Sequence, residues 1–144
     1  MVTRRSKNCS AGSKPHRMLY VIVFLGAGVG GALRHGVNVA ASRLFGFGFP
    51  YGTLIVNIAG SFVMGLFAGY FGFRSGIPQH LRLFLTTGML GGFTTFSSFS
   101  LDTALLIERH AYWLAAAYVA GSCAAGLIAL FAGMSLFRIE SHIP

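Results

Sequence analysis

The residues of this chain best suited to chemistry are neutral hydrogen-bond donors and aromatic rings, gathered in one stretch. Residues 91–100 read GGFTTFSSFS, in which five hydroxyl side chains are interleaved with three phenylalanines. Hydroxyl groups can replace the hydration water of a small anion, and the positive edge of an aromatic ring attracts it. Phe96 and Phe99 are three residues apart and share one face of a helix. The alternation therefore favours a small-anion site over the packing role that single phenylalanines usually have.

Three more polar side chains occur in otherwise apolar runs. Asn57 is followed at helical steps of three and four by Gly60, Ser61, Met64 and Gly65, and Tyr118 and Ser122 are four residues apart. A side-chain amide in hydrocarbon is costly unless it has a partner or meets an ion. Asn57 is therefore either an ion contact or one half of an interhelical hydrogen bond, and both alternatives stay open from the sequence.

The glycine pair Gly91 and Gly92 predicts a break in the helix that carries this stretch. A break within a membrane releases carbonyl oxygens that only a protein interior or an ion can satisfy. Such oxygens suit a hard cation such as sodium, and the hydroxyl of Thr94 or Thr95 could complete its coordination. We therefore expect an ion site at the break.

The elements that position these residues follow from composition. The chain has 144 residues, 54% of them hydrophobic and 10% charged, and its mean hydropathy of +0.68 indicates a membrane protein. A membrane-crossing helix needs about 20 apolar residues. Four runs qualify, namely residues 18–39, 53–73, 83–107 and 113–137. We expect an all-α membrane protein with four transmembrane helices, the third broken near Gly91–Gly92.

Charge predicts the organisation of the chain. Residues 1–17 form a basic tail, residues 18–138 the four-helix transmembrane domain, and residues 139–144 a short C-terminal tail. The net charge of +8 is dispersed around helix ends, which excludes a nucleic-acid-binding face. With the tail the N-terminus is expected in the cytoplasm, and without it the loop charges balance, as in chains that insert in both orientations. Met18 is an alternative start, so we expect the tail to be dispensable.

Several function classes are excluded. The chain has only three carboxylates and no phosphate-binding loop, so pumps and hydrolytic enzymes are not expected. Its two cysteines are neither spaced for zinc nor paired for redox chemistry, and both are interpreted as structurally incidental. Small residues at four-residue intervals, such as Gly26 with Gly30 and Gly88 with Gly92, predict closely packed helices. One such bundle is filled by its own side chains, so a pore requires a homodimer.

Three stretches resemble, in order and separation, the successive motifs of the Fluc (CrcB) family of bacterial fluoride channels. They read GALRHGVN, YGTLIVNIAGSFVMG and TGMLGGFTTFSSFSLDT, and the similarity runs from about residue 25 to residue 122. The resemblance implies a multi-pass protein of the bacterial plasma (inner) membrane that forms an antiparallel, dual-topology homodimer with two pores. It further implies passive export of fluoride, which lowers its toxicity, and a structural sodium ion at the dimer centre.

The resemblance also implies roles by position. Arg34 corresponds to a vestibule arginine, and the sodium ligands correspond to the backbone carbonyls of Gly91 and Thr94. The fluoride pore is then lined by Asn57, Phe96, Phe99, Tyr118 and Ser122.

The chain departs from the family pattern at Gly126, where a further hydroxyl is frequent, and at Asp102, where a glutamate is common. The long basic tail is a third departure. Two other functions stay open. A small multidrug-type transporter of dual topology has the same size, although it relies on a glutamate in its first helix, and the first run here has no carboxylate. A non-catalytic membrane assembly subunit would use GGFTTFSSFS for packing only.

Overall fold

The computed structural model of the protein describes residues 14–73 and 76–138. The chain forms three long helices, α1, α2 and α6. Between α2 and α6 lies a discontinuous segment made of α3, η1, α4 and α5, of which η1 is a π-helix. The bounds are α1 Lys14–Phe45, α2 Tyr51–Phe73, α3 Gln79–Leu83, η1 Phe84–Leu90, α4 Gly91–Phe93, α5 Phe96–Glu108 and α6 Tyr112–Arg138. No strand occurs within these two described ranges, which confirms the predicted all-α class.

Three of the four predicted spans are confirmed by length and composition. Residues 17–45, 51–72 and 112–137 are helices long and apolar enough to cross a membrane. The third predicted span, residues 83–107, is no single membrane-length helix because the chain leaves helical geometry within it. Helix α1 begins at Lys14, inside the predicted tail, and the rest of that tail and residues 139–144 lie outside the described residues.

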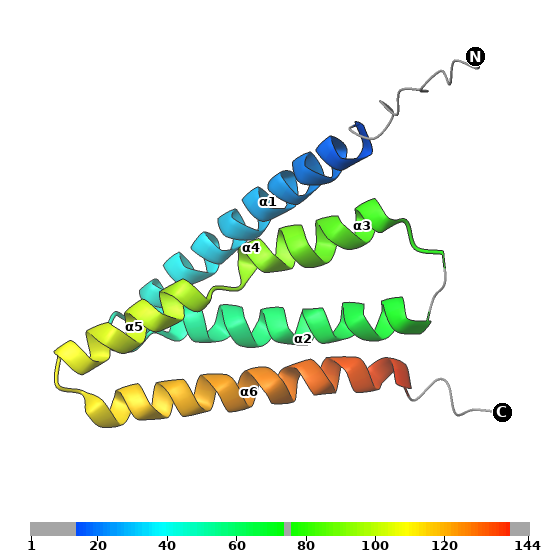
Figure 1. The fold of residues 1–144 in the computed structure, drawn as a ribbon. Helices are drawn as coiled ribbons and strands as arrows, with labels where there is room; N and C mark the ends of the chain where they lie inside the picture. Colours follow the sequence, from blue (N-terminus) through cyan, green and yellow to red (C-terminus); the bar gives the residue numbers. More distant parts are fainter. Residues whose placement is uncertain (1–13, 74–75, 139–144) are drawn as a thin grey trace, which may run out of the picture.

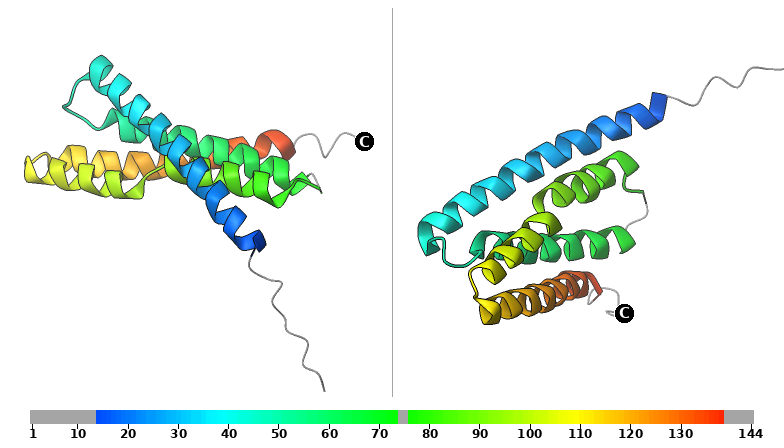
Figure 2. Two further views of the ribbon diagram at one scale, coloured as in Figure 1. Left: turned by 90° about the horizontal axis from the view of Figure 1, so that it is seen from above. Right: turned by 60° about the vertical axis from the view of Figure 1, so that its left-hand side comes forward.

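The helices form two pairs. Helices α2 and α6 run side by side along their lengths, while α1 packs obliquely across η1 and α4 (Figures 1 and 2). Beyond the break, α5 turns away from α1 and contacts α6 instead. The beginning of α1 and the end of α6 lie at the same end of the bundle, which agrees with an even number of crossings.

Glycines bring the paired backbones into contact. A Cβ atom added at Gly92 would lie 2.5 Å from the carbonyl oxygen of Ala27, and one at Gly65 would overlap the carbonyl oxygen of Leu130. In lipid, where helices associate by close packing and not by the hydrophobic effect, such glycines set the interhelical distance. The predicted packing role of these small residues is therefore confirmed.

The buried core sits at the end of the bundle where α5 meets α6. Tyr118, Leu106 and Ala115 form its centre, and Phe49 and Phe99 pack around it. Many other large apolar side chains lie on the outside, as expected for helices whose surroundings are hydrocarbon.

We predict that Gly30→Ala destabilises the protein, because the new methyl group would overlap the carbonyl oxygen of Met89 and crowd Phe93 N. Overpacking of this kind costs about 1–3 kcal/mol. The melting temperature in detergent measures the effect. Gly28→Ala is the matched control on the same helix, since its Cβ meets nothing within 4 Å. Equal melting temperatures for the two variants would contradict a tight contact between α1 and the discontinuous segment.

Candidate functional site

The site is organised around a break at Thr94 and Thr95. Both residues have extended backbones, with φ −74° and ψ 154° at Thr94 and φ −150° and ψ 119° at Thr95. The predicted break near Gly91–Gly92 therefore exists but lies a few residues further on, and Gly91 itself is helical, with φ −64° and ψ −33°. Gly92 is needed for contact with α1, whereas the threonines have side chains that can form hydrogen bonds with a broken backbone.

Asn57 of α2 holds the break with two hydrogen bonds. Its Nδ2 donates to the carbonyl oxygen of Thr95 at 3.1 Å, and the Thr95 N–H donates to Asn57 Oδ1 at 2.8 Å. The side-chain amide thus pairs with both backbone polar groups of Thr95, the N-cap residue of α5, as a neighbouring strand would. Of the two alternatives for Asn57, the interhelical hydrogen bond is present, and one N–H of its amide remains for another acceptor.

The two threonine hydroxyls cap the helix ends on either side of the break. Thr94 Oγ1 donates to the carbonyl oxygen of Leu90 at 2.9 Å, at the end of the first half. At the start of α5, Thr95 Oγ1 accepts from the Ser98 N–H at 3.2 Å, as an N-cap residue does. Thr95 is buried, so the break is an ordered element held by its own hydroxyls and by Asn57.

The same arrangement frees two carbonyl oxygens. In an uninterrupted helix the Thr95 N–H would donate to Gly91, but here it donates to Asn57. Among the residues that the structure describes, no donor reaches the carbonyl oxygen of Gly91 or of Thr94. Gly91 lies on the outside of the bundle, where a second molecule or an ion can approach it. These are the two positions that the sequence predicts for a cation.

A groove of about 340 Å³ runs between α2, α5 and α6 at the break. Four of the five predicted pore residues line it, namely Asn57, Phe96, Phe99 and Ser122. The rings of Phe96 and Phe99 have centroids 5.7 Å apart. Ser122 is only 9% exposed, and its Oγ has no hydrogen-bond partner in the described part of the chain. The groove therefore combines aromatic rings with an unused hydrogen-bond donor.

The fifth predicted residue, Tyr118, lies behind the groove in the core. Its ring contacts Phe99 at a centroid distance of 5.2 Å and meets Phe49 edge-on at 5.5 Å. Its hydroxyl donates to Asp102 Oδ2 at 3.4 Å. Tyr118 is 1% exposed. It contacts Phe99, which lines the groove, and Asp102, which lines a second cavity.

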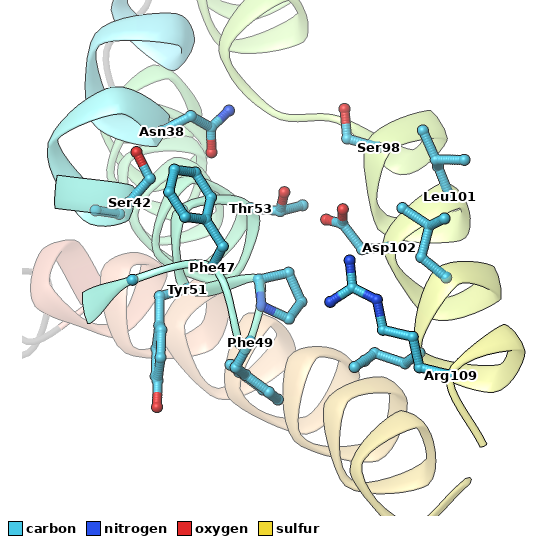
Figure 3. A pocket seen from close by; sticks show the side chains of 17 residues that line it. Asn38, Ser42, Phe47, Phe49, Tyr51, Thr53, Ser98, Leu101, Asp102 and Arg109 are labelled. Carbon is cyan, nitrogen blue, oxygen red and sulfur yellow. The ribbon is translucent and has the colours of Figure 1, made fainter. Parts of the chain in front are cut away.

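The second cavity, of about 330 Å³, lies between the α1–α2 loop and α5 (Figure 3). Asp102 and Arg109 enter it from α5, opposite Asn38 and Thr53 (Figure 3). The sequence identified Asp102 as a departure from the family pattern but assigned it no role, and it did not predict this second cavity. Its polar lining is scattered over three helices: Asn38, Ser42, Thr53, Ser98, Asp102 and Arg109.

Two other predicted features are placed by the structure. Arg34 is half-buried on α1 and lines neither the groove nor the second cavity. Within residues 14–73 and 76–138 there is no cluster of three or more histidine, cysteine or acidic side chains that could hold a metal ion. The candidate cation ligands are therefore the backbone oxygens at the break.

We predict that Asn57→Ala destabilises the protein much more than Ser122→Ala does. The first change leaves the backbone N–H and carbonyl oxygen of buried Thr95 without the Asn57 partner, which costs roughly 1–3 kcal/mol. The second removes a hydroxyl that has no protein partner. Thermal unfolding in detergent compares the two free energies, and an equal loss in both variants would be inconsistent with the Asn57–Thr95 pair.

The chain is similar in sequence to proteins that are named as ion channels. Residues 21–134 match the family model described as CrcB-like protein, Camphor Resistance (CrcB). The chain is 57% identical to the "Fluoride-specific ion channel FluC" of Rhodopseudomonas palustris (strain BisB5), over 84% of this chain and 98% of that protein. It is 61% identical to the protein of that name from Methylobacterium nodulans, over 82% of this chain and 94% of the relative. It is 52% identical to the protein of that name from Granulibacter bethesdensis, over 84% of this chain and 95% of the relative.

Proposed function

The chain belongs to the CrcB-like family, and we propose that it is a fluoride-selective channel of the bacterial inner membrane, not an enzyme. The names of its relatives support fluoride as the conducted ion. The observation that carries the proposal is the groove at the break, which is lined by aromatic rings and by a buried hydroxyl that has no hydrogen-bond partner in the described part of the chain.

The unpartnered hydroxyl of Ser122 is the strongest support for an anion in this groove. A buried hydroxyl without a partner costs about 1–3 kcal/mol. A fluoride ion in the groove would accept a hydrogen bond from Ser122 and from the remaining N–H of Asn57. The edges of Phe96 and Phe99 would supply further positive potential. Four groups would thus replace the water that the ion sheds.

The groove lining favours conduction over tight binding. No lysine or arginine is among its lining residues, so an ion meets only neutral dipoles. Conduction requires that each site bind strongly enough for entry and weakly enough for exit. A fixed positive charge in hydrocarbon would hold a small anion too strongly for rapid release.

Passive export follows from the membrane potential. Fluoride enters acidified cells as the neutral acid, dissociates in the more alkaline cytoplasm and is trapped there as an anion. A negative interior then drives each anion outward with about 2.3 kcal/mol per 100 mV. A channel alone therefore suffices, and no coupled energy source is needed.

A structural sodium ion is the second part of the proposal. The freed carbonyl oxygens of Gly91 and Thr94 are hard ligands of the kind that sodium prefers, and Gly91 lies on the outer surface. In an antiparallel homodimer the two breaks meet at the symmetry axis, so each copy would contribute this oxygen pair. The ion would supply a fixed positive charge that holds the two breaks together.

The first experiment measures fluoride efflux from liposomes that contain the purified full chain. We expect rapid release of fluoride, little release of chloride, and a clear loss of fluoride release when N-methylglucamine replaces sodium on both sides. Unchanged release without sodium would overturn the sodium proposal. Absence of fluoride efflux from a verified, folded dimer would overturn the proposed channel function and favour the assembly-subunit alternative.

We predict that Ser122→Ala slows fluoride efflux by roughly tenfold or more, since a hydrogen bond to an ion contributes about 1.5–3 kcal/mol. The matched control is Ser135→Ala on the same helix, because that exposed hydroxyl donates to the carbonyl oxygen of Ala132 and lies outside the groove. The initial rates of fluoride efflux at equal protein density compare the two variants. Identical rates in the two variants would remove Ser122 from the pathway.

A further inference from the structure

We infer that the thiol of Cys123 stands on the wall of the fluoride pathway and is a site at which water-borne, thiol-selective electrophiles close it. The inference rests on the proposed channel function. It also changes the interpretation of Cys123, to which sequence spacing assigns no role.

Cys123 lines the groove beside Ser122. It is exposed and carries a free thiol, and it shares the groove with Asn57, Phe96 and Phe99. Its neighbour Ser122 points independently to a ligand in this space, because its nearly buried Oγ is without a partner. A thiol and an unused ion contact therefore border one cavity.

The packing of α2 on α6 sets the depth of the thiol. A Cβ at Gly65 would overlap the carbonyl oxygen of Leu130, and one turn earlier a Cβ at Gly126 would lie 3.6 Å from Ser61 Oγ. Both pairs have the same offset along the two helices, so a further turn brings Asn57 level with Ser122. Cys123 is thus at the depth of the break, where the proposed ion contacts are concentrated.

Polar surroundings distinguish this thiol from one that faces lipid. The nucleophile in thiol chemistry is the thiolate, which requires water to form and to meet a charged reagent. The groove offers that water a side-chain amide and several hydroxyls. Gly126, one turn beyond Ser122, has no side chain, which leaves room in the groove for an adduct on Cys123.

The reaction with a methanethiosulfonate is a simple exchange. The Cys123 thiol releases its proton to water, and the sulfur attacks the sulfenyl sulfur of the reagent. A disulfide bond forms, the bond between sulfenyl and sulfonyl sulfur breaks, and methanesulfinate leaves with the electron pair. With the sulfonatoethyl reagent the groove gains a bulky negative group that both fills space and repels fluoride.

The test uses the full chain with Cys9→Ser, so that Cys123 is the single thiol. Fluoride efflux from liposomes is measured before and after treatment with sulfonatoethyl methanethiosulfonate, and intact-mass spectrometry counts the adducts. We expect one adduct, a fall in efflux of at least tenfold, and recovery after dithiothreitol.

Two matched controls separate the pathway from the lipid. The double variant Cys9→Ser, Cys123→Ala should conduct and resist the reagent. Adding Ile128→Cys to it moves the thiol to an exposed position on the opposite side of α6, where neither labelling nor inhibition is expected.

The outcomes are distinguishable. No adduct on Cys123, or normal efflux after complete labelling, would overturn this inference while the channel function stands. Absence of efflux from the untreated protein would instead overturn the proposed function and, with it, any block.

Discussion

The structure depends on the pair of hydrogen bonds that the Asn57 amide forms with the N–H and the carbonyl oxygen of Thr95. In hydrocarbon a helix can end only where its unpaired backbone N–H and carbonyl groups find new hydrogen-bond partners. Asn57 supplies a donor to the carbonyl oxygen and an acceptor to the N–H of Thr95, and the hydroxyls of Thr94 and Thr95 bind the adjacent helix ends. Because the Thr95 N–H is thereby withdrawn from Gly91, the carbonyl oxygens of the break are free for other chemistry.

The break also separates two environments along the bundle. On one side, close glycine contacts hold α1 against η1 and α4. On the other, α5 leaves α1 and, with α6, encloses the core around Tyr118. The ring of this tyrosine contacts Phe99, which lines the groove, and its hydroxyl donates to Asp102, which lines the second cavity. A change of direction in one segment therefore creates both spaces.

Sequence reasoning predicted those features that depend on local pattern. The three continuous spans follow from run length, and the break follows from glycine and hydroxyl residues in an apolar run. Its exact place did not follow, because Gly92 is required by contact with Ala27 on a distant helix. The two roles of Asn57 could not be separated without knowing that Thr95 lies opposite. The second cavity was missed because residues as far apart as Asn38 and Arg109 meet only in the folded chain.

The length of α1 has a consequence for its place in a bilayer. Its candidate membrane span, residues 17–45, covers 29 residues, which at 1.5 Å per residue is about 44 Å, against a hydrocarbon thickness of about 30 Å. A helix of that length matches the bilayer only by tilting or by extending into the headgroup region. Helix α1 crosses the other helices obliquely (Figure 2), so the helices cannot all lie along the membrane normal. A bilayer of different thickness is therefore expected to change the angle at which α1 packs against η1 and α4.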